Sequence, residues 1–197
     1  MNSSLVFNTW IKNKDIKDKM AKKSFPLSKV YSLLESGPVV LVTTASKGRA
    51  NIMAMSWHMM VDFEPPLVSF IVSDRNYSFS ALKATKECVL NIPTLAIAEQ
   101  AVGCGNTSGA KIDKFATFGL TASPAKQVQA PLIEECYASL ECRVVDTKNV
   151  NKYGMFIAEV MQAWVDPKVK KPQTIHHYGK ENFMIAGNHI KLKSKMK

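Results

Sequence analysis

The sequence predicts a mainly β protein, a β-barrel with helical additions. Three observations favour this fold class: short runs rich in β-branched and aromatic residues recur along the chain, turn-forming residues separate most of them, and segments with helical spacing are few. Many strands joined by short turns are typical of a barrel. The 197 residues, of which 46% are apolar and 21% charged, can bury one sizeable core. We therefore expect one main domain.

The first half of this domain is expected to consist mostly of strands. A short helix from Leu27 to Leu34 has apolar residues at helical spacing and ends at Gly37-Pro38. The elements expected after it are a strand at 38–45, a turn at 46–49, an extended segment at 50–63, a strand at 67–73, a helix at 78–86 and a strand at 88–92.

The second half contains a helix, a long loop and two long strands. Thr94 is a candidate N-cap for a helix at 95–102. Residues 103–119 are rich in Gly, Ser and Lys with little periodicity, which predicts a long loop of the kind that is functional or disordered. Residues 137–145 and 155–165 have the composition of strands on a half-buried surface.

The net charge of +10 lies at the two ends of the chain. Residues 12–23 hold six Lys against two Asp, residues 167–197 hold eight Lys against one Glu, and residues 24–166 hold 12 basic and 13 acidic residues. This pattern predicts a flexible basic N-terminal segment at 1–24, a domain at 25–190 and a basic tail at 191–197, with Met20 as a second candidate start. Basic ends without interleaved aromatic residues favour solvated tails over a nucleic-acid surface.

The cysteines and the hydropathy indicate a protein of the reducing cytoplasm. Cys88, Cys104, Cys136 and Cys142 form no C-x-x-C pair and are expected to be reduced, with Cys88 and Cys142 as small core residues. The sequence shows neither an apolar run of transmembrane length nor a signal peptide, so we expect a cytoplasmic protein without membrane attachment.

Common catalytic and nucleotide-binding motifs are missing from the sequence. Neither G-x-x-x-x-G-K-[ST] nor a correctly spaced dinucleotide fingerprint occurs, and H-E-x-x-H and G-x-S-x-G are absent too. His176 and His177 are adjacent and would point to opposite sides of a strand. We expect an ordinary surface strand there, with a role at a ligand site as the alternative.

A candidate phosphate site lies where a strand meets a helix, at Asp74-Arg75-Asn76-Tyr77-Ser78. The helix N-terminus, the Arg75 guanidinium and the Ser78 hydroxyl could together hold a phosphate dianion. The alternative is that Asn76 or Ser78 caps the helix and Arg75 is solvated.

Three further segments could hold a planar ring. The Met-rich run from Asn51 to His58 suits a ring lying against a strand, although its apolar residues could equally fill the core. Asn91 ends an apolar strand and could be a site residue or a turn former. Lys111 and Lys114 could contact a phosphate, or could be solvated loop lysines.

These segments, in order, resemble a known family. Pro38-Val39-Val40-Leu41-Val42-Thr43-Thr44, then Asn51-Ile52-Met53-Ala54-Met55-Ser56-Trp57, then Pro65-Pro66-Leu67-Val68 resemble the opening of the flavin reductase-like, flavoredoxin-type family. Later matches are Arg75 to Ser78, Asn91-Ile92-Pro93, Lys114-Phe115 and Leu140 to Val144, so the resemblance spans roughly Pro26 to Val165.

The resemblance implies an FMN-binding split barrel that forms a homodimer with the flavin held noncovalently near the interface. It implies that Ala54 to Trp57 line the isoalloxazine ring, that Arg75 to Ser78 surround the phosphate, that Asn91 approaches the ring, and that Ser108 to Phe115 close over the cofactor. The full set of expected cofactor-binding residues is Asn51, Ala54, Met55, Ser56, Trp57, Ser73, Arg75, Asn76, Tyr77, Ser78, Asn91, Ser108, Gly109, Lys111, Lys114 and Phe115. We expect no catalytic side chain and no metal.

The resemblance leaves two functions open. One is NAD(P)H-dependent flavin reduction or related electron transfer, with FMN or FAD as flavin and NADH or NADPH as donor. The other is a flavoredoxin-type electron carrier with tightly bound FMN and a protein redox partner. Many nicotinamide-using members carry Gly-Asp-His where this chain has Asn151-Lys152-Tyr153, which favours a protein donor. A third hypothesis, a basic adaptor that binds nucleic acid or an acidic surface, depends on the two charged ends alone.

Overall fold

The computed structural model describes residues 26–28, 33–34 and 37–193. The chain divides into two compact units, Met1–Leu33 and Leu34–Lys197, and all the helices and strands given below belong to the second. The expected N-terminal segment at 1–24, most of the expected helix from Leu27 to Leu34 and the last four residues lie outside the described part of the chain.

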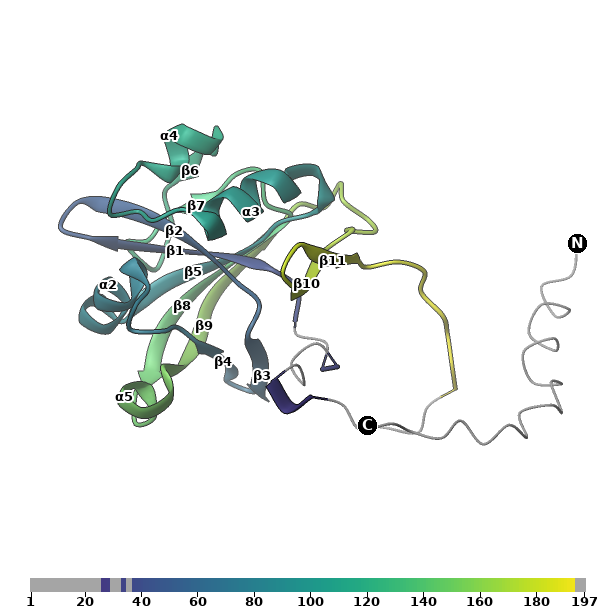
Figure 1. Cartoon of the computed structure of the whole chain (residues 1–197), viewed down its shortest axis with the longest axis horizontal. Coiled ribbons are helices and arrows are strands. Elements are labelled where there is room, and N and C mark those ends of the chain that lie inside the picture. The colour runs from purple at the N-terminus through teal and green to yellow at the C-terminus, as the bar shows by residue number, and fades with distance from the viewer. Residues whose placement is uncertain (1–25, 29–32, 35–36, 194–197) are drawn as a thin grey trace, which may run out of the picture. The chain divides into compact units, whose positions relative to one another are not determined.

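A seven-stranded antiparallel sheet dominates the fold (Figure 1). Each strand pairs with its neighbours in antiparallel register, and this confirms the mainly β class that the sequence predicts. In their order across the sheet the strands are β2 (Arg49–Met55), β1 (Val40–Ser46), β5 (Glu87–Ile92), β8 (Ala138–Asp146), β9 (Met155–Val165), β4 (Pro66–Ile71) and β3 (His58–Phe63).

The two edge strands of this sheet are consecutive in the chain. Only Ser56 and Trp57 separate the end of β2 from the start of β3. Because neighbouring strands lie about 4.8 Å apart, a flat sheet of this width would hold its edges roughly 30 Å apart. The sheet must therefore roll up until its edges meet at Ser56-Trp57, where the Trp57 carbonyl accepts a 3.0 Å hydrogen bond from the Ile71 amide at the end of β4. The expectation of one extended segment at 50–63 is wrong at this junction.

Helices cover both faces of the rolled sheet, and the side chains of β1 point alternately to the two faces. Val40 and Val42 point into one core with Leu82 of α2 (Tyr77–Thr85) and Val150 of α5 (Val150–Tyr153). The intervening Leu41 points into a second core beneath α3 (Ala98–Asn106), which follows the short 3-10 helix η2 (Leu95–Ile97). Figure 1 shows α2 and α3 on opposite sides of β1. Among the described helices, none combines the length and the apolar character that crossing a membrane requires.

Two small hairpins complete the fold. Strands β6 (Ala122–Ser123) and β7 (Leu132–Ile133) pair with each other, as do β10 (Ile175–Gly179) and β11 (Asn182–Ile185). The Ile175 carbonyl accepts a 2.7 Å hydrogen bond from the Val39 amide, which anchors the β10–β11 hairpin next to the start of β1.

The prediction of one long loop at 103–119 is wrong for 103–106 and 114–118, which are helical, whereas 107–113 is a loop. Helix α3 continues through Asn106, and α4 (Lys114–Phe118) begins after Asp113, whose side chain accepts a hydrogen bond from the Ala116 amide. Gly103 serves close packing inside α3, because a Cβ atom on it would stand 2.3 Å from the Phe118 ring, and Gly119 ends α4 as its left-handed C-cap.

All four cysteines are free, as the sequence analysis expects, and Cys104 and Cys136 are buried as well as the expected Cys88 and Cys142. Cys88 and Cys142 are partners across the β5–β8 pair and belong to the same core. Burial raises the pKa of the Cys104 thiol to about 11, although the nearby Lys114 lowers it.

Candidate functional site

Two adjoining cavities lie between β2, α3 and the segments around them. The small cavity has a volume of about 140 Å³ and the large cavity about 620 Å³, and Ala54 and Gly105 line both. The small cavity is lined by Asn51, Met53, Ala54, Arg75, Asn76, Tyr77, Ser78, Cys104, Gly105, Thr107, Ser108, Gly109 and Lys114. The large cavity is lined by Val39, Ala54, Met55, Ser56, Ala101, Val102, Gly105, Asn106, His177, Lys180, Glu181 and Phe183.

The start of α2 forms one wall of the small cavity. Asn76 is the N-cap residue, but its side chain makes no capping hydrogen bond. The Ser78 hydroxyl is also not a cap, because it accepts a 2.7 Å hydrogen bond from Asn51 Nδ2 on β2. The first amides of a helix carry its positive dipole end. In α2 the Phe79 amide already donates to the Asn76 carbonyl at 3.0 Å, which leaves the Tyr77 and Ser78 amides as candidate donors to an anion. This wall is therefore suited to an anion. Neither Asn76 nor Ser78 caps the helix as the alternative in the sequence analysis expects, whereas Arg75 is exposed, as that alternative expects.

Lys114 brings a buried positive charge to the same cavity. The residue is only 5% exposed, and its ammonium donates to the carbonyls of Ile52 at 2.7 Å and Cys104 at 2.6 Å. Neither of the two ion pairs found within the described residues includes Lys114. An ammonium has three protons, so these two bonds leave one for an anion. Burial lowers the pKa of Lys114, and the neighbouring Cys104 opposes this shift.

The loop between α3 and α4 covers the small cavity with a tight contact. Gly109 is buried, and a Cβ atom on it would stand 1.8 Å from Asn51 Oδ1 and 3.0 Å from Tyr77 Cδ1. Within the loop, the Ser108 carbonyl accepts from the Lys111 amide at 3.0 Å. Only a residue without a side chain can bring the loop this close to β2.

The large cavity has apolar walls and a polar rim. The end of β2 and one side of α3 supply small and apolar side chains, while the β10–β11 hairpin supplies His177, Lys180 and Phe183. His177 Nε2 lies 2.9 Å from the Lys180 carbonyl, and the His177 and Phe183 rings are 5.0 Å apart. A space of this size, with few polar groups at its edge, suits a planar organic ring.

The comparison with protein families identifies the domain. A model of the flavin reductase like domain matches residues 34–183. The chain belongs to this family. The family that the sequence analysis expected from its resemblance is thereby confirmed.

Relatives and solved structures agree with this assignment. The uncharacterized protein YddH of Escherichia coli K12 is 31% identical over 172 residues, which cover 80% of this chain and 91% of YddH. The structure of an FMN-binding domain of a flavin reductases-like enzyme from Shewanella baltica is 26% identical with a TM-score of 0.76, covering 87% of this chain and 97% of that one. Flavoredoxin of Desulfovibrio vulgaris (Miyazaki F) is 22% identical with a TM-score of 0.75, covering 91% and 98%, and shows the fold alone.

Most of the residues expected at the site of this flavin reductase-like domain do come together. Those that line one or both cavities are Asn51, Ala54, Met55, Ser56, Arg75, Asn76, Tyr77, Ser78, Ser108, Gly109 and Lys114. Ser73 and Lys111 flank the small cavity without lining it, and Trp57 is 61% exposed beside Ser56. Phe115 packs against the second core instead of facing the cavity.

Asn91 lies inside the sheet and lines neither cavity. Its Nδ2 donates to the Leu41 carbonyl at 3.0 Å, and its Oδ1 accepts from the Ile133 amide at 3.0 Å and from the Ser139 hydroxyl at 2.7 Å. These bonds link β1, β5, β7 and β8, so the side chain has no capacity left for a ring. The structure thus replaces the expected approach of Asn91 to the flavin ring with a structural role.

Several cavity residues were not predicted from the sequence. The residues of α3 were missed because the sequence analysis divides this segment between a helix and a loop. The residues of the β10–β11 hairpin were missed because they lie far from the other cavity residues in the sequence. Gly179 was a usable signal for a hairpin, because tight hairpin turns favour residues that adopt positive φ. In the structure Gly179 has a φ of 101° and Lys180 a φ of 53°. The residues are Val39, Met53, Ala101, Val102, Cys104, Gly105, Asn106, Thr107, His177, Lys180, Glu181 and Phe183.

Proposed function

We propose that this domain binds FMN, with the phosphate in the small cavity and the isoalloxazine ring in the large one, and that it serves in flavin redox chemistry. The observation that carries the proposal is the junction of a small cationic cavity with a larger apolar one along Ala54 and Gly105. A phosphorylated flavin has the same two parts, an anionic end and a planar ring joined by a flexible chain. The FMN-binding domain from Shewanella baltica, with its similar fold, supports this assignment.

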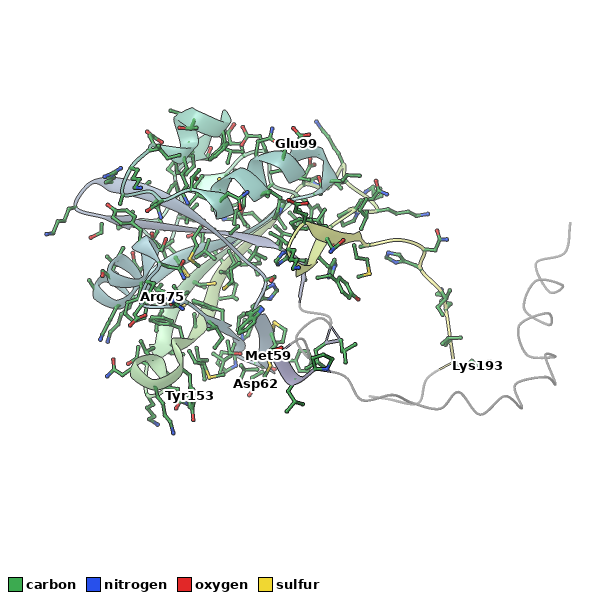
Figure 2. The ribbon with its side chains drawn as sticks, viewed as in Figure 1. Met59, Asp62, Arg75, Glu99, Tyr153 and Lys193 are labelled. Carbon is green, nitrogen blue, oxygen red and sulfur yellow. The ribbon has the colours of Figure 1, made fainter. Side chains whose placement is uncertain are left out.

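The small cavity offers a phosphate the donors that it needs. They are the first-turn amides of α2, the remaining proton of Lys114 and the guanidinium of Arg75, which stands at the start of α2 (Figure 2). Among the described residues, none that lines this cavity carries a carboxylate. Because the loop at 107–109 covers it, a terminal phosphate fits better than the diester of FAD, so we propose FMN as the flavin.

The large cavity orients the ring and shields part of it from water. Residues Ala54 to Ser56 would lie along the ring and Val102 would pack against it, while the β10–β11 hairpin closes the far side. Bound FMN would supply hydride or single-electron transfer, so the protein needs no acid or base of its own. The role of this chain is to hold, orient and partly cover the cofactor.

We favour NAD(P)H-dependent flavin reduction, and the rim of the large cavity supports it. His177 and Lys180 line this rim together with Glu181, and we propose that the first two contact the anionic part of a nicotinamide dinucleotide. The alternative is a flavoredoxin-type carrier that exchanges electrons with a protein partner. The sequence Asn151-Lys152-Tyr153 favours this alternative, because it stands where many nicotinamide-using members have Gly-Asp-His. These three residues belong to α5 and line neither cavity.

We further propose a cytoplasmic homodimer. The edge strand β3 exposes Met59, Met60 and Phe63, the last at 87%, and Figure 2 shows Met59 on this strand. An apolar edge strand open to solvent invites pairing with another chain, and a second copy of this edge is a self-complementary partner. Four reduced cysteines are in keeping with a reducing compartment.

The visible absorption spectrum tests the proposal. The purified protein is mixed with FMN, desalted and scanned, and we expect an oxidised flavin spectrum at one flavin per chain. Adding NADH or NADPH without oxygen should bleach it if the domain is a reductase, whereas a carrier would keep its colour until a reduced protein partner is added. No retained flavin, together with no quenching of FMN fluorescence during titration, would overturn FMN binding.

A further inference from the structure

We propose that Arg49 is a latch, a positioning residue that holds the loop at 107–111 over the small cavity and slows the departure of the phosphorylated flavin. The inference rests on the proposed function, because it concerns how the same site retains its ligand. Arg49 lines neither cavity, so it would act through the residues that do.

One side chain connects three separate segments. Arg49 follows the tight turn at Lys47-Gly48, where both residues have positive φ, and starts strand β2. Its Nη2 donates a 2.6 Å hydrogen bond to the Gly109 carbonyl. Its guanidinium carbon lies 5.7 Å from the centre of the Tyr77 ring, and Nη1 lies 3.5 Å from the Tyr77 hydroxyl.

Both residues that Arg49 contacts line the small cavity. Gly109 covers it from the loop, and Tyr77 is the first residue of α2. Asn51 lies two residues along β2 from Arg49. Its side chain packs closely against Gly109 and donates a hydrogen bond to Ser78 of α2. The loop is thus held by β2 at two points, by a close contact inside and by the Arg49 hydrogen bond at the surface.

The chemistry of arginine suits this role better than that of lysine. A guanidinium can donate in its plane to a carbonyl while its face lies over an aromatic ring, whereas an ammonium is a compact point charge without this planar fork. Neither ion pair in the described part of the chain includes Arg49, so its contacts are with the loop and with Tyr77. Since a hydrogen bond near the surface contributes modestly, we expect its loss to change a rate by about 3- to 10-fold.

The test compares Arg49→Gln with the wild-type protein for two ligands, FMN and riboflavin. Stopped-flow fluorescence gives the association rate and the release rate of each ligand. Riboflavin serves as the comparison because it has the ring without the phosphate. We expect Arg49→Gln to release FMN about 3- to 10-fold faster, with riboflavin affinity within about twofold of the wild type. The association rate of FMN should not fall, because the latch closes after the phosphate has entered.

Arg143→Gln is the matched control. Arg143 also donates to a loop carbonyl, that of Gln127 at 3.4 Å, but lines neither cavity and contacts no residue that does. This variant loses the same charge and should leave both FMN rates unchanged. Arg49→Lys should resemble Arg49→Gln, because a positive charge alone does not make the latch.

Three results would overturn the latch while leaving FMN binding in place. The first is an FMN release rate of Arg49→Gln within twofold of the wild type. The second is a loss of riboflavin affinity in Arg49→Gln as large as its loss of FMN affinity. The third is a wild-type rate of FMN release in Arg49→Lys. A slower, salt-dependent association rate with unchanged release would assign Arg49 to electrostatic steering instead. If the wild-type protein binds no FMN, the proposed function fails and the latch fails with it.

Discussion

Gly109 lies so close to Asn51 that a Cβ atom on the glycine would stand 1.8 Å from the Asn51 Oδ1 atom. Asn51 cannot easily yield, because it is buried and its amide donates to Ser78. Any side chain at position 109 must therefore push the covering loop away from the small cavity.

Gly109→Ala should accordingly weaken FMN binding by at least about tenfold, since displacing the loop removes one wall of a phosphate site and its charge-assisted contacts. FMN fluorescence quenching measures the affinity. Gly187→Ala is the control, because a Cβ atom there would meet only the Ile185 carbonyl at 4.0 Å. Equal FMN affinity in Gly109→Ala and the wild type would show that the loop does not cover the phosphate.

Lys114 should make FMN binding depend on pH. Burial lowers its pKa, so as pH rises the ammonium loses its proton before an exposed lysine would, and the cavity loses positive charge. FMN affinity should then fall on the alkaline side, while riboflavin affinity stays level. Lys114→Met should bind FMN about 10- to 100-fold more weakly and lose this pH dependence. An alkaline decline that persists in Lys114→Met would assign it to another group.

The same shift makes the flavin-free protein more stable as pH rises. The unfolded chain keeps the Lys114 proton to a higher pH than the folded one, so stability increases between the two pKa values. The unfolding free energies of the wild type and of Lys114→Met, measured by urea denaturation, should therefore converge at alkaline pH.

Asn91 should matter for stability and not for the flavin. Asn91→Ala leaves the Ile133 amide and the Ser139 hydroxyl without their shared acceptor inside the sheet, which should cost about 2–4 kcal/mol of unfolding free energy. Urea denaturation checks this cost. FMN affinity of the folded variant should remain within about twofold of the wild type. A large loss of affinity without a loss of stability would return Asn91 to the site.

Glu141 should give the protein a stability that disappears in acid. This fully buried carboxylate of β8 accepts from the Lys126 and Gln127 amides and from Trp164 Nε1. Burial alone would raise its pKa, but these hydrogen bonds outweigh burial and leave the pKa of Glu141 below its ordinary value. The carboxylate therefore stabilises the fold above its unfolded pKa, and this stabilisation is lost as pH falls through the folded pKa.

Glu141→Gln should then lower the unfolding free energy by about 1–3 kcal/mol at neutral pH. The difference from the wild type should shrink as the solution is acidified. Guanidinium denaturation at a series of pH values measures both effects. A difference that stays constant down to strongly acid solution would mean that the loss is one of packing and not of charge.

Strand β3 should hold the dimer together. Met59→Lys combined with Phe63→Glu places charges on an exposed apolar edge and should yield a monomer in sedimentation equilibrium. Ile190→Lys changes an equally exposed apolar residue outside the sheet and should leave the dimer intact. A wild-type protein that sediments as a monomer would refute the dimer directly.

Local sequence patterns predicted most strands because composition and turns mark them. Strand β9 has the predicted bounds, since only Glu159 and Gln162 interrupt its long run of apolar and β-branched residues. The break at Ser56-Trp57 was missed because it contains no Gly or Pro and a single Ser is a weak turn signal between two extended segments. That break results from pairing β3 with β4 and not with β2, and such long-range pairing leaves no local mark.

The candidate site was predictable where one short segment supplies several contacts. Arg75 to Ser78 follow a strand and start a helix, so the phosphate wall could be inferred from their order. The hairpin wall with His177 and the Arg49 latch depend on segments that only the folded chain brings together. The resemblance misplaced Asn91 for a physical reason, because a buried amide satisfies several main-chain groups as readily as it contacts a ligand.

Gly105 shows what the elongated site demands of the rest of the molecule. It lies inside α3, where alanine would favour the helix by roughly 0.5–1 kcal/mol. A Cβ atom at this position would stand 3.3 Å from the Ala54 Cβ, at the boundary that the two cavities share. One added methyl group would thus narrow the passage between two chambers while making the helix more stable. Under the proposed function, helix stability and the room that FMN needs therefore make opposite demands on this one position.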